Sequence, residues 1–143
     1  MSPARTACEY VPIASGASRV WIAVFMAGYL SPMISALEKL LGTARDGALL
    51  RYSLGLEYEK AGDAARAAQY LYDAVERDAR YSAAWKALGR VLAGAGRADE
   101  AREAYRRGIE AAREKGDRQA EKEMTVFMKR LEKAARAPGK DPQ

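Results

Sequence analysis

The sequence has 143 residues, of which 49% are apolar and 30% are charged, and its formal net charge is +5. This length allows one domain with a modest core, and the composition is that of an ordinary globular protein. There is no histidine and only one cysteine, Cys8, so the commonest general base and metal ligand are missing and no intramolecular disulfide can form. We therefore expect no metal, no cofactor and no catalytic activity.

The segment 1–32 differs in composition from the rest of the chain. It holds three of the five prolines and few charges, and its apolar run at 20–30 is too short to span a membrane. Three interpretations stay open: a disordered extension or an assigned start upstream of the true one at Met33, an export signal within 1–36, or a helix that packs or touches a membrane. We expect a cytoplasmic protein unless the signal interpretation holds.

The stretch from Met33 to residue 136 contains no proline and is rich in Ala, Glu, Arg and Leu, which favours helix throughout. Glycines and capping residues divide it. The predicted helices are 33–41, 48–60, 64–77, 83–93, 98–114 and 118–136. The predicted N-caps are Asp46, Asp63, Ser82 and Asp117, and the predicted stops are Gly42, Gly62, Gly94, Gly96 and Gly116. The polar tail 137–143 carries two prolines and is expected to be disordered.

The sequence matches itself at an offset of 34 residues. Leu54-Gly55 falls on Leu88-Gly89, and Ala61-Gly62 falls on Ala95-Gly96. Small residues recur where two helices of a repeat would approach closely, and large residues would fill the gaps between them. The small residues are Gly55, Ala67, Ala74, Gly89, Ala101 and Gly108.

Residues 48–81 and 82–115 resemble two tetratricopeptide repeats (TPR), as found in small bacterial TPR proteins, because a 34-residue period built from two helices is typical of that family. The family motif W-x-x-L-G reads Trp85-Lys86-Ala87-Leu88-Gly89, and Arg51 stands at the tryptophan position of the first repeat. The resemblance implies an all-α fold: a right-handed array of helical hairpins that binds protein and catalyses nothing.

Two further helices are expected to cover the open ends of the two repeats, giving a domain at 33–136. The helix 33–41 is a half-repeat, with Met33, Leu37, Leu40 and Leu41 on its packing face. The helix within 117–136 is a cap, with charged residues such as Glu123 on its solvated faces. Its apolar stripe is interpreted as core: Ala120, Met124, Phe127, Met128 and Leu131.

The resemblance implies that the second, fifth, ninth and twelfth residues of each repeat line a concave groove. The candidate partner-binding residues there are Leu49, Tyr52, Leu56, Glu59, Lys86 and Arg90. Lys86 and Arg90 lie four residues apart, hence on one helix face, with no carboxylate expected beside them. We therefore expect a protein or peptide partner with an acidic group or a free C-terminal carboxylate, the alternative being that both cations are merely exposed surface.

The sequence pI of about 9.4 suggests a second class of function, association with nucleic acid. Against it, the basic residues alternate with acids and no run of five or more occurs. A small-molecule substrate is not expected, and a membrane is expected as a partner only if residues 20–30 insert.

Overall fold

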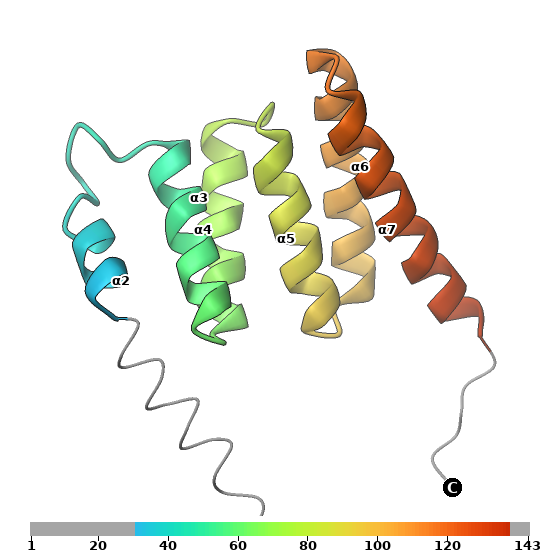
Figure 1. The fold of residues 1–143 in the computed structure, drawn as a ribbon, viewed down its shortest axis with the longest axis horizontal. Coiled ribbons are helices and arrows are strands. Elements are labelled where there is room, and N and C mark those ends of the chain that lie inside the picture. The colour runs from blue at the N-terminus through green and yellow to red at the C-terminus, as the bar shows by residue number, and fades with distance from the viewer. Residues whose placement is uncertain (1–30, 138–143) are drawn as a thin grey trace, which may run out of the picture.

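The computed structural model describes residues 31–137, and within that range the regular elements are six α-helices. They lie side by side in chain order from α2 to α7 (Figure 1). Their bounds are α2 Ser31–Glu38, α3 Ala48–Lys60, α4 Ala64–Arg77, α5 Ser82–Gly94, α6 Ala98–Lys115 and α7 Arg118–Arg136. The fold is all-α, as predicted.

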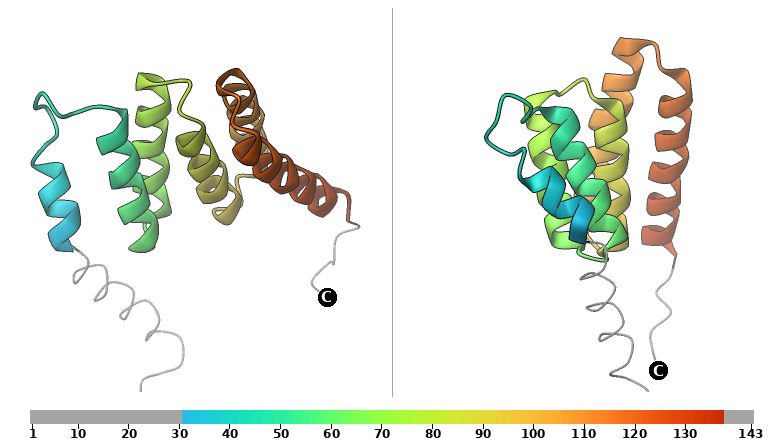
Figure 2. Two further views of the ribbon diagram at one scale, coloured as in Figure 1. Left: turned by 45° about the horizontal axis from the view of Figure 1, so that its top comes forward. Right: turned by 60° about the vertical axis from the view of Figure 1, so that its left-hand side comes forward.

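The helices form two layers that curve toward one side. Successive helices pack as α3 on α4, α5 on α6 and α7 on α6, joined by short turns (Figure 2). Cα atoms of α3 come within 8 Å of α5, and those of α5 within 8 Å of α7, whereas no Cα of α4 comes this close to α6. The layer of α3, α5 and α7 is therefore the tighter, inner side of the curve, and we call its surface the inner face.

The core confirms the predicted alternation of small and large residues. Ala67, Ala74 and Ala101 are fully buried. A Cβ added to Gly55 would lie 2.5 Å from Cγ of Leu71, so this glycine allows α3 and α4 to approach. The large side chains with no exposure are Leu54, Leu71, Leu88, Leu92 and Met124.

Most predicted helix ends are confirmed. Gly62, Gly96 and Gly116 have positive φ just beyond α3, α5 and α6, a conformation that costs glycine no steric clash. The carboxylates of Asp63 and Asp117 each accept a hydrogen bond at 3.0 Å from a backbone N–H in the first turn of α4 and α7.

Two predicted N-caps are wrong. Gly47 occupies the N-cap of α3, while the Asp46 carboxylate accepts hydrogen bonds from Arg51 and from the Gly42 N–H. The guanidinium is the stronger, charged partner, and it draws Asp46 away from the helix end. At α5 the N-cap is Tyr81, and Ser82 is the first helical residue and is buried.

The first predicted helix differs from α2 in both its bounds and its buried face. α2 ends at Glu38, and Ile34, not Met33, is the residue that packs into the core: Ile34 is 8% exposed and Met33 is 56% exposed. Leu37, Leu40 and Leu41 pack against the core as expected. Beyond Glu38 the backbone hydrogen bonds run three residues back, from Leu40 N–H to Leu37 O and from Leu41 N–H to Glu38 O, so the chain continues in turns and not as an α-helix.

The predictions for residues 1–30 and 138–143 lie outside the described residues. None of the described helices has the length and apolar character needed to cross a membrane.

In the first repeat, Arg51 stands at the position of the W-x-x-L-G tryptophan and forms a cluster of ion pairs. Arg51 donates to Asp46 at 2.8 Å and to Asp73 at 3.0 Å, and its guanidinium lies 5.9 Å from the centre of the Tyr70 ring. In the second repeat, Trp85 is buried and donates from Nε1 to the Ala79 carbonyl at 2.9 Å. One repeat therefore closes this position with a polar network and the other with an indole.

The predicted apolar stripe of the last helix is confirmed as core. Ala120 and Met124 are buried, and Phe127, Met128 and Leu131 pack partly buried against Tyr105, Ile109 and Ala112 of α6. A Cβ on Gly108 would lie 2.5 Å from Sδ of Met124, so α7 also packs closely on α6.

Candidate functional site

The apolar part of the predicted groove lies on α3 at the inner face. Leu49 is 66% exposed, one of the few large apolar side chains of the described residues that face solvent. Tyr52 and Leu56 follow at helical spacing on the same face and are half-buried. The Tyr52 ring lies against Tyr81, with ring centres 5.0 Å apart.

In the basic part of the predicted groove, each cation has a carboxylate partner. Arg90 of α5 binds Glu59 of α3 in a bidentate pair, Nε to Oε1 at 2.8 Å and Nη2 to Oε2 at 2.7 Å. Lys86 Nζ donates to Oε2 of Glu123 on α7 at 2.7 Å. The expectation that both cations stand without a carboxylate is wrong, as is the placement of Glu123 on the solvated side of the cap.

These two pairs connect the three inner helices, α3 to α5 and α5 to α7. The hydrogen bond with Glu59 raises the pKa of Arg90, and the hydrogen bonds from Lys86 and Gln119 lower the pKa of Glu123. The pairs leave donors free: Arg90 uses Nε and Nη2, so its Nη1 edge carries no hydrogen bond among the described residues, and its side chain is 52% exposed. A carboxylate from a partner can therefore reach Arg90 without displacing Glu59.

Glu123 and Tyr81 are the residues of this surface that sequence reasoning missed. Glu123 lies 34 residues after Gly89, which is buried against Tyr105, so the repeat period alone would not have placed it beside Lys86. Tyr81 closes the first repeat, immediately before α5, and its position against Tyr52 depends on the turn between α4 and α5.

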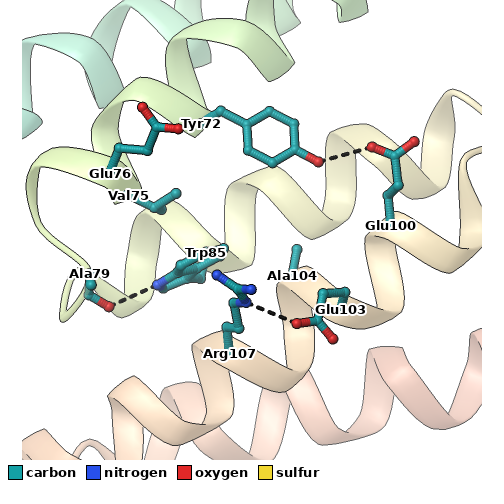
Figure 3. Close-up of a pocket in the computed structure, with 9 residues that line it drawn as sticks. All are labelled: Tyr72, Val75, Glu76, Ala79, Trp85, Glu100, Glu103, Ala104 and Arg107. Carbon is teal, nitrogen blue, oxygen red and sulfur yellow. Dashed lines mark hydrogen bonds and ion pairs between the residues drawn. The ribbon is translucent and has the colours of Figure 1, made fainter.

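A second hollow lies on the opposite side, where α4 and α6 diverge. This cavity of about 480 Å³ has Trp85 and Ala104 at its base, and the Arg107 guanidinium lies 5.8 Å from the centre of the indole (Figure 3). Tyr72 donates to Glu100 at 3.0 Å across its rim, and Arg107 donates to Glu103 at 2.9 Å. Glu103 and Arg107 thus pair with each other at the rim, whereas Glu76 forms no ion pair among the described residues. This hollow escaped prediction because it arises from the divergence of two helices.

No group of three or more His, Cys, Asp or Glu side chains among the described residues could hold a metal ion.

The carboxylates of Glu100 and Glu103 on α6, with their hydrogen-bond partners, predict how the stability of the protein depends on pH. Hydrogen bonds from Arg106 and Arg107 lower the pKa of Glu103 to about 2. Arg97 and Tyr72 lower the pKa of Glu100 in the same way. A carboxylate whose pKa is lower in the folded state stabilises the protein above its unfolded pKa, and this contribution is lost as pH falls through the folded pKa.

Stability to urea is therefore expected to be nearly constant from about pH 7 to about pH 5 and to fall steadily toward about pH 2. Urea titrations followed by circular dichroism would measure it. Glu103→Gln, which cannot titrate, should show a shallower fall below pH 5, and a slope identical to that of the wild type would contradict the assignment.

Comparison with known proteins adds the relatives of this fold. Residues 58–121 match the tetratricopeptide-repeat family. A TPR repeat-containing protein of Pseudomonas aeruginosa is 51% identical over 102 residues, which cover 71% of this chain and 97% of the relative. The chain belongs to the tetratricopeptide-repeat family. The resemblance inferred from the W-x-x-L-G motif and the 34-residue period is thereby confirmed.

Solved structures agree with this TPR assignment. The solution structure of a Bordetella parapertussis protein is 39% identical, with a TM-score of 0.62, and the match covers 71% of this chain and 88% of that one. A TPR domain protein from Salinibacter ruber is 29% identical, with a TM-score of 0.61 and coverage of 66% and 95%. TPR folds are generally scaffolds for protein–protein interaction, and these comparisons indicate no catalytic family.

Proposed function

We propose that this TPR protein is an adaptor that binds a peptide or a partner protein through its inner face. The observation that carries the proposal is the exposed Leu49 beside half-buried Tyr52 and Leu56, at the spacing of one helix face. An apolar surface rimmed by polar groups is typical of an interaction site, because burying it on binding is favourable. The binding unit is the domain at 33–136, and we propose a cytoplasmic location, or export if residues 1–36 act as a signal.

The chemistry of the inner face favours a partner with an apolar side chain followed by an acidic group. The apolar side chain would lie on Leu49 and Tyr52, and the acidic group, a side chain or a C-terminal carboxylate, would bind the free edge of Arg90. Lys86 has two further ammonium protons beyond the one given to Glu123, so it can add a second contact. The pairs with Glu59 and Glu123 hold both cations in place before a partner arrives, which lowers the entropic cost of binding.

A photo-crosslinking experiment tests this proposal. A benzophenone amino acid is placed at Leu49 on the inner face or, as a control, at the exposed Ala65 on α4. We expect a specific adduct with a partner protein in the source cells from position 49, absent from position 65. The adduct should fall at least about tenfold with Tyr52→Ala, the loss of about 1.4 kcal/mol of binding energy.

A charge swap separates the role of Arg90 from that of its ion pair. Arg90→Glu with Glu59→Arg keeps an ion pair between α3 and α5 but moves the cation by one helix. If the partner binds Arg90, the swap should reduce the adduct while urea stability changes little. Equal adducts from positions 49 and 65 would refute binding at the inner face. A charge swap that leaves the adduct unchanged would refute the role of Arg90.

A further inference from the structure

The outer face of α7 carries a row of cations that runs the length of the helix. The row recurs every three or four residues, so its members share one face, opposite the face that Met124 buries in the core. Each of these side chains is exposed, and one valine, Val126, interrupts the row. We call it the basic stripe: Arg118, Lys122, Lys129, Lys133 and Arg136.

None of these cations is in an ion pair within residues 31–137, and among the described residues only Lys39, Arg45, Lys115 and Arg130 share that property. On α3, α4, α5 and α6, every Lys and Arg except Lys115 has a carboxylate within 4 Å. On α7, Glu121 is bound by Arg113 and Glu123 by Lys86, both from neighbouring helices. Glu121 lies beside Arg118 and Lys122 in a shallow hollow, but its carboxylate is bound by Arg113, and no carboxylate of residues 31–137 forms an ion pair with a stripe cation.

The stripe is a long array of like charges. Its five cations equal the formal net charge of +5, so the rest of the chain is neutral in sum. At a rise of about 1.5 Å per residue the stripe is about 27 Å long. That exceeds the Debye length of about 8 Å at physiological salt, so no single carboxylate can neutralise it. The ligand must be a row of anions.

We propose that the basic stripe binds the sugar-phosphate backbone of duplex nucleic acid, independently of sequence. A duplex carries a negative charge about every 1.7 Å of its axis, which supplies an unbroken row of anions along the stripe. The stripe has no aromatic side chain on which an unpaired base could stack, so it favours a duplex over a single strand. The apolar face of α7 is buried against α6, so the helix cannot insert into a bilayer as an interfacial helix does.

This inference is independent of the proposed function. Glu123, the α7 residue that binds Lys86 at the inner face, is not in the stripe, and no stripe residue is among the proposed partner-binding residues. A TPR protein with both surfaces would bind a protein partner at the inner face and nucleic acid at the basic stripe.

Fluorescence anisotropy with a labelled mixed-sequence DNA duplex of about 20 base pairs, longer than the stripe at ~3.4 Å per base pair, tests the proposal. The logarithm of the association constant should fall against the logarithm of salt concentration with a slope of about −4.5, about −0.9 for each of the five cations. Binding should therefore weaken about 500-fold between about 50 and about 200 mM salt.

Two double variants make the comparison specific. Lys129→Gln/Lys133→Gln removes two stripe cations and should weaken binding at least about tenfold and reduce the slope by about 1.8. Lys39→Gln/Arg45→Gln removes two exposed cations from the connection between α2 and α3, also outside any ion pair among the described residues, and should change neither. All four positions are exposed, and circular dichroism checks that both variants stay folded.

Three results would overturn the inference. The first is no binding of the duplex at the lowest salt. The second is equal weakening by both double variants. The third is binding that is as strong to poly-L-glutamate, or to phosphatidylcholine vesicles containing phosphatidylserine, as to the duplex, which would assign the stripe to an acidic protein or a lipid surface.

Discussion

Replacing Gly89 with alanine is expected to destabilise the protein by about 1–3 kcal/mol, although alanine is the better helix former. A Cβ at this position would lie 2.6 Å from Cδ1 and 2.7 Å from Cζ of Tyr105, with Cε1 closer still. The ring cannot move aside freely, because Tyr105 is 2% exposed and its centre lies 5.8 Å from that of Phe127. The new methyl group must therefore push α5 and α6 apart. Urea denaturation followed by circular dichroism measures the loss.

Gly94→Ala is the matched control for this prediction. Gly94 is in the same helix, and a Cβ there would meet nothing within 4 Å. Without a clash, the gain in helix propensity should stabilise the protein by up to about 1 kcal/mol. Opposite signs for the two alanines would identify close packing as the reason for the glycine of the W-x-x-L-G motif. Equal signs would mean that α5 and α6 have room to spare at Gly89.

The helix bounds could be read from the sequence because they depend on local signals. The bounds of α3, α4 and α7 agree with the predicted ranges 48–60, 64–77 and 118–136 at both ends. A glycine with positive φ follows α3, and an aspartate caps α4 and α7, so these three boundaries are decided by residues next to them in the chain. The same local signals recur 34 residues later, as the positive φ of Gly62 recurs at Gly96.

The ion pairs of the inner face could not be read in this way. Arg90 and Glu59 are 31 residues apart, and Lys86 and Glu123 are 37 apart, so their contact depends on how three helices lie beside one another. A carboxylate near a cation in the chain is visible in the sequence, whereas one brought beside it by another helix is not. The same reason explains the N-cap error at Asp46, where a guanidinium five residues away competes with the helix end.

The basic stripe is another feature that is hard to recognise in the linear sequence, because its cations come together only on a helix. A search for runs of basic residues misses it, because its cations are spaced by three to seven residues with acids such as Glu121 and Glu132 between them. On a helix the cations align on one face, and these acids lie along its edge. Whether acids neutralise such a row depends on partners contributed by other helices, as Arg113 contributes to Glu121.

Replacing Met124 with alanine is expected to destabilise the protein by about 2–5 kcal/mol, the usual range for removing a fully buried methionine side chain. The loss should be concentrated at one end of the array. α7 contacts only α6 and α5, and repeat proteins unfold from ends whose interfaces are weakened. Native-state hydrogen exchange should therefore show lost protection in α7 first, while the amides of α3 and α4 stay close to wild type.

Val126→Ala separates this effect from a change of helix propensity. Val126 is in the same helix but 46% exposed, so its truncation should change stability by less than about 0.5 kcal/mol. Because Glu123 is held beside Lys86 by the docking of α7, Met124→Ala should also weaken partner binding at the inner face, whereas Val126→Ala should not. Uniform loss of protection over all helices in Met124→Ala would mean that the domain unfolds as one cooperative unit and that α7 is integral to the fold.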